Sequence, residues 1–314
     1  MAYVEIIKKG KKNFYYLTQT IRLEKKFKKV RRFLGKGIIP NEKLMQLAKI
    51  AEVPLGEKVK EFKKVRKLAK LDKETVKKLE SIKTGYKKLT SSISTIEYTV
   101  IEKQQFIRFT FNTNAIEGST ITLKETSHIL EDGISPEGKD LREIHEVENT
   151  KKAYDFMKKY REDVNINFIR KIHYHLTYNI LGENAGTFRR IQVYMEGSKH
   201  MPPKPSELRG EMGAMMRWVK NHKSMHPVVL AAYAHHLLLA IHPFVDGNGR
   251  TARLLLNFML MKSGFPPVCI KKEERIRYTY YLEFARDGDI SLFLDFIIKK
   301  IDEAYNEIMD TIKK

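Results

Sequence analysis

The residues best suited to carry chemistry in this chain lie together between positions 242 and 253. His242 is followed by Asp246, by the turn Gly247–Gly249, and by Arg250 and Arg253. A glycine-rich loop that opens a helix presents unpaired backbone N–H groups, and the helix dipole makes this place favourable for anions, phosphates above all. Asp246 offers oxygen to a divalent cation, and an imidazole beside such a site is suited to act as a general base. These residue types predict nucleotide or phosphate chemistry with a histidine base.

Two helices and the turn between them must position these groups. Apolar residues recur at steps of four, three and four between Leu230 and Ile241, which is helical spacing. Pro243 disfavours helix at the residue before it, and the two glycines of the turn can take positive φ. Apolar residues at Leu254 and Phe258 indicate that a helix resumes after the turn. The stretch is therefore predicted to be helix, tight loop, helix.

Each of these features has a simpler explanation when taken alone. A Gly-Asn-Gly sequence is usually only a turn, a histidine at a helix end is more often structural, and two arginines on a helix usually form a solvated face. Here the base, the acid, the glycines and both arginines fall within twelve residues. We therefore favour a common function over chance.

Residues 242–253, His-Pro-Phe-Val-Asp-Gly-Asn-Gly-Arg-Thr-Ala-Arg, resemble the signature of the Fic (Fido) family, His-x-Phe-x-(Asp/Glu)-Gly-Asn-Gly-(Arg/Lys)-x-x-Arg, at every fixed position. The resemblance implies a protein adenylyltransferase (AMPylator), which moves AMP from ATP to a Ser, Thr or Tyr hydroxyl of a protein with Mg²⁺. It also implies a role for each fixed residue: proton abstraction by His242, anchoring by Phe244, Mg²⁺ binding by Asp246, and ATP binding by Gly247, Asn248, Gly249, Arg250 and Arg253. Relatives with lysine at the position of Arg250 act as kinases instead.

A second motif precedes the first. Thr113, Glu117 and Gly118 resemble the family's inhibitory motif, (Ser/Thr)-x-x-x-Glu-(Gly/Asn), as it occurs in members whose inhibitory helix lies on the N-terminal side. The resemblance implies that Glu117 pairs with Arg253, in bidentate fashion, and so occupies the partner of the γ-phosphate. We expect a largely self-inhibited enzyme. In some relatives this glutamate also helps to remove AMP, and the sequence does not decide whether it does so here.

Two further segments resemble parts of the same family. Gln192–Met195 suits a strand and Gly197–Ser198 a turn, which resembles a β-hairpin flap that holds the target segment by main-chain hydrogen bonds. Relatives often have two adjacent tyrosines near the adenine pocket, and counting places Tyr278 and Thr279 at these positions. Thr279 departs from that pattern, which leaves the nucleotide preference open.

Two pairs of histidines invite a metal site. His173 and His175 are two apart on a predicted helix, and His235 and His236 are adjacent. Residues so spaced do not face each other on a helix, so we do not predict a shared zinc. We expect these histidines to be packing or surface residues.

Composition limits the class of protein. The single cysteine, Cys269, allows no intrachain disulfide, and no apolar run reaches transmembrane length. The N-terminus lacks the apolar core of a signal peptide, so we expect a cytoplasmic protein without membrane partners. The formal net charge of +21 favours nucleic acid, anionic membranes or acidic proteins as partners. Lysine enrichment for solubility or heat tolerance also explains this charge, and we slightly favour that explanation.

These patterns predict a mainly α fold, a Fic-type helical core over residues 105–300 with a β-hairpin flap. Residues 1–60 are predicted to form a basic extension, a β-meander and then helix, with a third strand that begins at Ile21 and Leu23. Residues 61–104 are predicted to form a charged helical linker, with helical spacing over 58–71 and 73–88, and residues 301–314 the end of a C-terminal helix. Two rival functions remain: another nucleotidyl or phosphoryl transferase on this fold, and a nucleic-acid-associated regulator. Expected partners are ATP, a protein substrate, the chain itself as a substrate, and nucleic acid at the basic extension.

Overall fold

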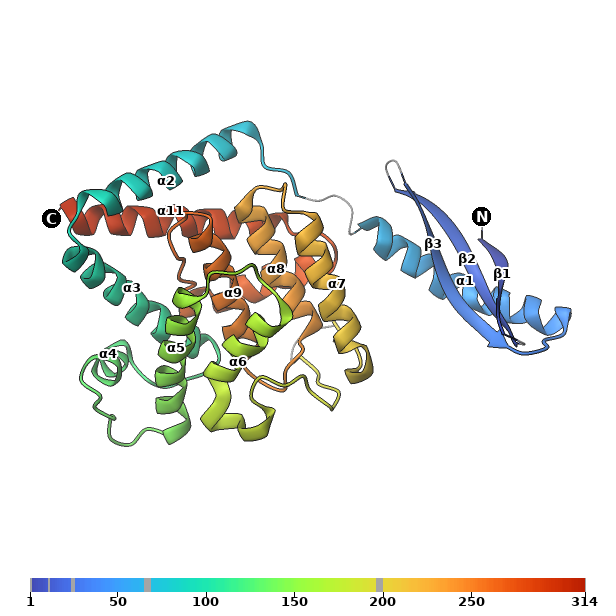
Figure 1. Ribbon diagram of the computed structural model, residues 1–314, viewed down its shortest axis with the longest axis horizontal. Helices are drawn as coiled ribbons and strands as arrows, with labels where there is room; N and C mark the ends of the chain where they lie inside the picture. Colours follow the sequence, from blue (N-terminus) through green and yellow to red (C-terminus); the bar gives the residue numbers. More distant parts are fainter. Residues whose placement is uncertain (1, 11, 24–25, 65–68, 196–199, 314) are drawn as a thin grey trace. The chain divides into compact units, whose positions relative to one another are not determined.

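The computed structural model describes residues 2–10, 12–23, 26–64, 69–195 and 200–313. The chain divides into two compact units, one of Met1–Leu68 with Asp287–Asp289 and one of Ala69–Arg286 with Ile290–Lys314. The first contains a small sheet and one helix, and the second is helical (Figure 1). In the described ranges no helix is both long enough and apolar enough to span a bilayer. The division into an extension, a linker and a domain at residues 60 and 104 stays a prediction.

The first unit is an antiparallel sheet packed on a helix. Strands β1 (Ala2–Lys9), β2 (Lys12–Leu23) and β3 (Lys26–Lys36) pair in chain order, and helix α1 (Asn41–Lys64) follows them. Val4 lies opposite Leu17 in the register, and both contact a small core that includes Ala48, Ala51 and Leu55 of the helix. The predicted β-rich N-terminal extension is thus confirmed.

Two expected boundaries in this part of the chain were wrong. Ile21 and Leu23 do not begin a third strand but end the second, because the pairing of β2 with β3 continues out to the pair Leu23 and Lys26. The helix expected over residues 58–71 ends at Lys64, and Ala69–Asp72 are not helical. The helical spacing of apolar residues among the lysines of 58–71 favoured one continuous helix and did not reveal this end.

The second unit is built from helices around one core. They are α2 (Lys73–Ser92), α3 (Thr95–Ile116), α4 (Leu123–Glu131), α5 (Leu141–Lys159), α6 (Ile166–Leu181), α7 (Leu208–Asn221), α8 (Pro227–Ile241), α9 (Asn248–Lys262), α10 (Arg275–Arg286) and α11 (Ser291–Lys313). Short 3₁₀ turns cover Gly182–Asn184, Pro205–Glu207 and Lys272–Glu274. The predicted mainly α fold, the helix over 73–88 and the C-terminal helix are confirmed.

Helices α8 and α9 form the centre of this unit (Figure 1). Pro227 opens α8 at a position where a missing N–H has no cost, and buried residues such as Leu238 and Leu254 recur along both helices. Helix α2 packs on α11, where Leu79 is fully buried and Lys78 pairs with Asp302 at 2.9 Å. The predicted catalytic loop is therefore held between two core helices.

Local capping fixes the start of α3, the helix that leads to Glu117. The Ser94 hydroxyl accepts the backbone N–H of Glu97, and the Glu97 carboxylate accepts the N–H of Ser94, which is a capping box. The helix ends at Ile116 with Glu117 as its C-cap residue and Gly118 at φ +107° just beyond. Glycine adopts that φ without strain, which makes it the usual residue just after a helix end.

Candidate active site

The loop between α8 and α9 is closed by reciprocal hydrogen bonds. Phe244 is fully buried; its N–H donates to Asn248 Oδ1 at 3.0 Å, and Asn248 Nδ2 donates back to the Phe244 carbonyl at 2.9 Å. The Asn248 side chain therefore shapes the loop from inside. The predicted helix–loop–helix is confirmed.

His173 of α6 packs against the same loop. Its ring stacks on Phe244, with centroids 3.7 Å apart and an interplanar angle of 3°. The Gly186 N–H donates to Nδ1 at 2.9 Å, so the proton lies on Nε2, which donates to the Asp246 carbonyl at 2.9 Å. Burial lowers the pKa of His173 to about 4, so the ring is neutral at pH 7. His173 is a packing histidine, as expected, and it also holds the loop.

Gly247 is required by this packing. Its φ is +75°, and a Cβ at this position would lie 3.1 Å from the Thr177 methyl group and 3.4 Å from the His173 ring. Any larger residue at position 247 would strain the backbone and displace the loop from Thr177 and His173.

His242 ends α8 in the left-handed conformation, with φ +50°. Its backbone carbonyl accepts a hydrogen bond from Arg189 Nε at 2.9 Å, which helps to hold this uncommon backbone. Burial lowers the pKa of the His242 imidazole to about 4. A neutral imidazole has a lone pair that can accept a proton, as a general base requires.

The first turn of α9 forms an anion cradle, and Glu117 reaches into it. A Cβ on Gly249 would collide with Glu117 Oε1 and would lie 3.1 Å from Arg253 Nη1. The absence of a side chain at Gly249 is therefore what lets the carboxylate approach. Burial alone would raise the pKa of Glu117, but the charges of Arg253 and Arg250 outweigh it and hold that pKa below its ordinary value. The carboxylate is an anion in an anion site.

Arg253 makes three hydrogen bonds to the C-terminal end of α3 and its cap. Its Nε donates to Thr113 Oγ1 at 2.7 Å, and its Nη2 donates to the Thr113 carbonyl at 2.9 Å and to Glu117 Oε1 at 2.6 Å. The expected bidentate pairing with Glu117 was wrong, because Nη2 bonds a single carboxylate oxygen and Nε bonds Thr113 instead. Arg253 is buried, whereas the Glu117 side chain is 38% exposed. We call the contacts of Arg253 with Thr113 and Glu117 the clamp.

Asp246 and Arg250 belong to a charged network with two residues of α5. Asp246 Oδ2 lies 2.5 Å from Arg142 and 3.7 Å from Arg250, and Arg250 Nη1 lies 3.0 Å from Glu146 Oε1. The Gly247 N–H donates to Asp246 Oδ1 at 2.6 Å. The Arg250 side chain is only 2% exposed, so its predicted contact with ATP stays a prediction. Among the described residues no group of three or more His, Cys, Asp or Glu side chains is arranged to hold a metal.

Tyr278 lies next to Arg253 of the clamp. It is buried, its hydroxyl lies 2.9 Å from His235 Nε2, and it also contacts Arg253. Burial raises the pKa of Tyr278 to about 12. Thr279 is exposed. The predicted role of Tyr278 in ATP binding stays a prediction.

The segment expected to be a flap strand is irregular. Gln192–Met195 is not a strand, and Gly197–Ser198 lies outside the described residues. Side chains bind carbonyls on either side of this segment: Arg189 donates to those of Ile191 and Pro203, at 2.9 and 2.5 Å, and Gln192 to that of Pro202 at 3.0 Å. The expected strand was therefore wrong for these four residues.

Four supporting residues were missed from the sequence: Arg142, Glu146, His173 as a loop support, and Arg189. All lie more than 50 positions before the loop they serve. No spacing within the motif points to them.

The comparisons with known proteins agree with this geometry. Residues 163–260 match the model of the Fic/DOC family. A protein named "Protein adenylyltransferase Fic" from Drosophila persimilis is 36% identical over 232 residues, which cover 72% of this chain and 45% of that protein. Its namesake from Drosophila melanogaster is 39% identical over 201 residues, 62% of this chain and 40% of the relative. The chain thus spans less than half the length of these curated relatives.

Solved structures give the same result. Fic-1 from C. elegans superposes with a TM-score of 0.67 at 28% identity, covering 87% of this chain and 78% of that one. A Fic-domain signaling protein from Bacteroides thetaiotaomicron reaches 0.68 at 21% identity, covering 75% and 96%, which shows a shared fold. With the complete motif on a closed loop between α8 and α9, these matches show that the chain belongs to the Fic/DOC family.

Proposed function

We propose that this chain is a protein adenylyltransferase, which transfers AMP from ATP to a Ser, Thr or Tyr hydroxyl of a protein, and that Glu117 keeps it largely inhibited. One observation carries the proposal: the Glu117 carboxylate lies on Gly249 and binds Arg253, where the α9 N-terminus favours an anion. The names of the relatives support the activity.

The chain's own residues can perform the steps of this reaction. His242 takes the proton from the target hydroxyl, whose oxygen then attacks the α-phosphorus of ATP. A bond forms between that oxygen and phosphorus, the bond to the β-phosphate oxygen breaks, and pyrophosphate leaves. The first turn of α9 and Arg253 hold the negative phosphates in place, which is how positioning and charge dominate phosphoryl chemistry.

Asp246 fits a role in binding Mg²⁺. Its side chain is 40% exposed at the mouth of the cradle, and Mg²⁺ is typically held by one or two carboxylates together with substrate phosphates and waters. When bound, the ion would neutralise phosphate charge. Arg142 and Arg250 contact the same carboxylate, so the ion has to share Asp246 with them.

Glu117 would inhibit by misplacing the phosphates. It holds Arg253, the proposed partner of the γ-phosphate, and its own charge repels the triphosphate. A displacement of the reacting atoms by about 1 Å can cost on the order of a hundredfold in rate. The inhibition therefore needs no exclusion of ATP from the cradle.

The test uses the Glu117→Gly chain with Mg²⁺, a cell lysate, and ATP labelled at the α- or the γ-phosphate. We expect protein labelling from the α-label, little from the γ-label, and none in the Glu117→Gly/His242→Ala double variant. Label from the γ-phosphate would point to phosphoryl transfer instead. Labelling that survives loss of His242 would reject the proposed base. A reaction without lysate tests self-modification, and unlabelled GTP, CTP and UTP as competitors test the nucleotide preference.

A second candidate function concerns the basic first unit. Residues 1–68 carry 20 of the 59 Lys and Arg but 6 of the 38 Asp and Glu, so +14 of the +21 net charge lies in this part. In the sheet, Tyr3 pairs with Thr18, which pairs with Arg31, and Tyr16 pairs with Phe33. Directly paired residues share a face, so rings and cations lie together there, with Arg31 also bound to Glu5 of this face at 2.6 Å. Phe33 is 53% exposed.

Such a face suits nucleic acid, because bases stack on rings while cations meet phosphates. We expect the full chain to bind fluorescent single-stranded DNA or RNA, with affinity that falls steeply with salt. Phe33→Ala should weaken binding about fivefold to 150-fold, as loss of one stacked base predicts, and Ile38→Ala, exposed but outside the strands, should not. Equal affinity of Phe33→Ala and the unchanged chain would leave only a solvated basic surface.

A further inference from the structure

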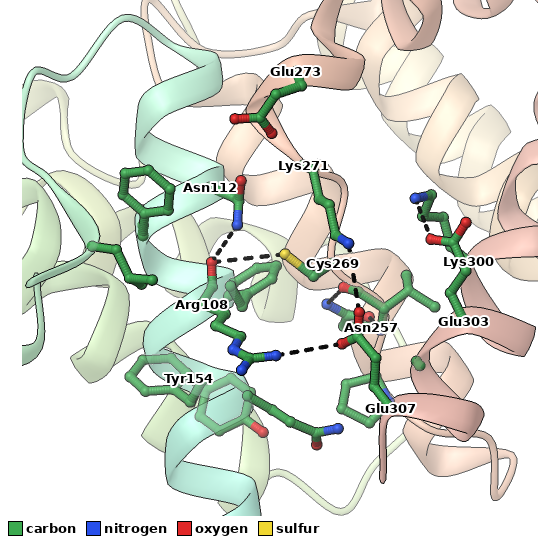
Figure 2. A pocket seen from close by; sticks show the side chains of 18 residues that line it. Arg108, Asn112, Tyr154, Asn257, Cys269, Lys271, Glu273, Lys300, Glu303 and Glu307 are labelled. Atoms are coloured by element: carbon green, nitrogen blue, oxygen red, sulfur yellow. Dashed lines mark hydrogen bonds and ion pairs between the residues drawn. The ribbon is translucent and has the colours of Figure 1, made fainter. Parts of the chain in front are cut away.

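A cavity of about 320 Å³ lies between α3, residues 267–273 and α11 (Figure 2). His242, Asp246 and Arg253 are not among its lining residues, so it is separate from the catalytic loop. Its volume is within the range of small-molecule sites. The helix that forms one wall, α3, is the helix that carries Glu117.

The cavity and the clamp share their supports. On α3, Asn112 lines the cavity and accepts the Lys272 backbone N–H at 2.9 Å, while the next residue, Thr113, binds Arg253. On α9, Asn257 lines the cavity one turn after Arg253, and it exchanges hydrogen bonds with the backbone of Val268 at 2.8 and 3.0 Å. A movement of α3 that opens the clamp therefore also removes a wall of the cavity.

The lining indicates the class of ligand. Aromatic rings form the α3 side, among them Phe106, which packs on Tyr154 with ring centroids 4.5 Å apart. Arg108, also on α3, and Lys271, from residues 267–273, both point to one carboxylate, Glu307, at 3.8 and 3.5 Å (Figure 2). Three cations and three carboxylates line the cavity, and Lys300 is bound by Glu303 at 2.5 Å. Arg108 and Lys271, in contrast, lie beyond hydrogen-bond length from the one carboxylate that they share. A second carboxylate could bind between them.

We propose that this cavity binds a small aromatic carboxylate, and that its occupancy holds α3 in the clamped position. The ring fills the apolar side, and the carboxylate binds Arg108 and Lys271. Because the cavity is formed while Glu117 binds Arg253 and loses a wall when α3 leaves, the ligand has higher affinity for the clamped state. A ligand shifts an equilibrium only through such a difference in affinity. The regulatory part of this inference rests on the proposed inhibition by Glu117.

The binding test uses 3-phenylpropionate as the probe, with 3-phenylpropan-1-ol as its uncharged match. We expect the acid to bind the full chain with a dissociation constant of about 1 mM or below, as its size allows. Arg108→Gln and Lys271→Gln should each weaken binding about fivefold, since these cations are partly exposed. Lys159→Gln, exposed on α5, is the matched control. Equal binding of the alcohol, or binding unchanged in both cavity variants, overturns the site.

Cys269 provides an independent location of the ligand. It lines the cavity and is the only cysteine of the chain, so its reaction with N-ethylmaleimide reports on this place alone. Saturating 3-phenylpropionate should slow this reaction of the unchanged chain about threefold or more. Because the measurement needs no variant, poor folding of a variant does not affect it. An unchanged rate with bound probe would place the ligand elsewhere and refute the proposal.

Coupling is measured without ATP or a target protein. Amide hydrogen exchange of residues 105–117 should slow on binding, by the fivefold or more that is typical of linked sites. Labelling by the wild-type chain should fall by a similar factor, and by less in Glu117→Gly. Probe binding without slower exchange refutes the coupling. If Glu117→Gly transfers no AMP at all, the proposed function fails, while the binding and exchange results still decide this inference.

Discussion

The charge of Glu117 should account for only part of the inhibition, so Glu117→Gln should activate less than Glu117→Gly. The 2.6 Å contact with Arg253 is a charge-assisted hydrogen bond, a class that contributes about 1.5–3 kcal/mol. Because the Glu117 side chain is 38% exposed, solvent screening reduces this to about 1–2 kcal/mol. A factor of ten corresponds to about 1.4 kcal/mol, so the glutamine variant should transfer AMP about 5 to 30 times faster than wild type. The glycine variant also removes the Glu117 side chain that lies against Gly249. We therefore expect it to transfer AMP about a hundredfold or more faster than wild type.

The assay is the initial rate of protein labelling from α-labelled ATP at saturating ATP and Mg²⁺. The matched control is Glu102→Gln on α3, because Glu102 is also paired with a cation, Lys158 at 2.6 Å, but makes no bond to Arg253. Its rate should equal that of wild type. If neither Glu117 variant exceeds wild type, or if the control rises as much as Glu117→Gln, the clamp does not limit the reaction and the reasoning is wrong.

Three further predictions follow from the loop. Burial lowers the pKa of His242 to about 4, so the base is neutral above that pH, and kcat/KM of the activated variant should stay flat from pH 8 to about 5; a fall centred near 6.5 would contradict this. His173→Phe keeps a ring on Phe244 but leaves two buried hydrogen-bond partners unpaired, which should lower the free energy of unfolding by about 2–4 kcal/mol in urea titrations. Arg142→Gln removes the exposed competitor for Asp246 and should reduce the Mg²⁺ concentration needed for half-maximal rate about threefold; an increase would show that Arg142 positions the carboxylate.

The same histidines affect stability. The pKa values of His242 and His173 are lowered by burial to about 4 in the folded chain, against about 6.5 when unfolded. The unfolded chain therefore binds more protons between these values. The stability that these groups contribute is complete above pH 6.5 and is lost as the pH falls toward 4. Initial rates of AMP transfer at low pH must therefore be measured before the chain unfolds.

The catalytic loop could be predicted because its information is local. Helical spacing ends at Ile241, Pro243 stops the helix, and Gly247 permits the positive φ that the turn needs. Phe244 was expected to anchor the loop and is fully buried. The link between Glu117 and Arg253, 136 positions apart, required the family resemblance, because no spacing rule connects such distant residues.

The remainder depends on contacts that only the folded chain forms. His173 was set aside as a metal ligand on spacing alone, yet its ring and both nitrogens hold the loop. Gln192–Met195 suits a strand by residue type, but residue type does not reveal that Arg189 binds the carbonyls of Ile191 and Pro203 on either side of it. Where no partner strand is present, a buried arginine can donate the hydrogen bonds that backbone carbonyls need.

The features that prepare the cradle for phosphate also explain why a carboxylate of the same chain can inhibit it. The α9 N-terminus, the bare Gly249 and the buried Arg253 favour any anion that can approach. Glu117 is tethered beside them, so its effective concentration is far above that of a free carboxylate. Yet it offers one charge and one hydrogen-bonded oxygen, whereas a triphosphate offers several of each. The proposed inhibited state is therefore a close balance, which the proposed ligand at α3 or a single substitution should shift.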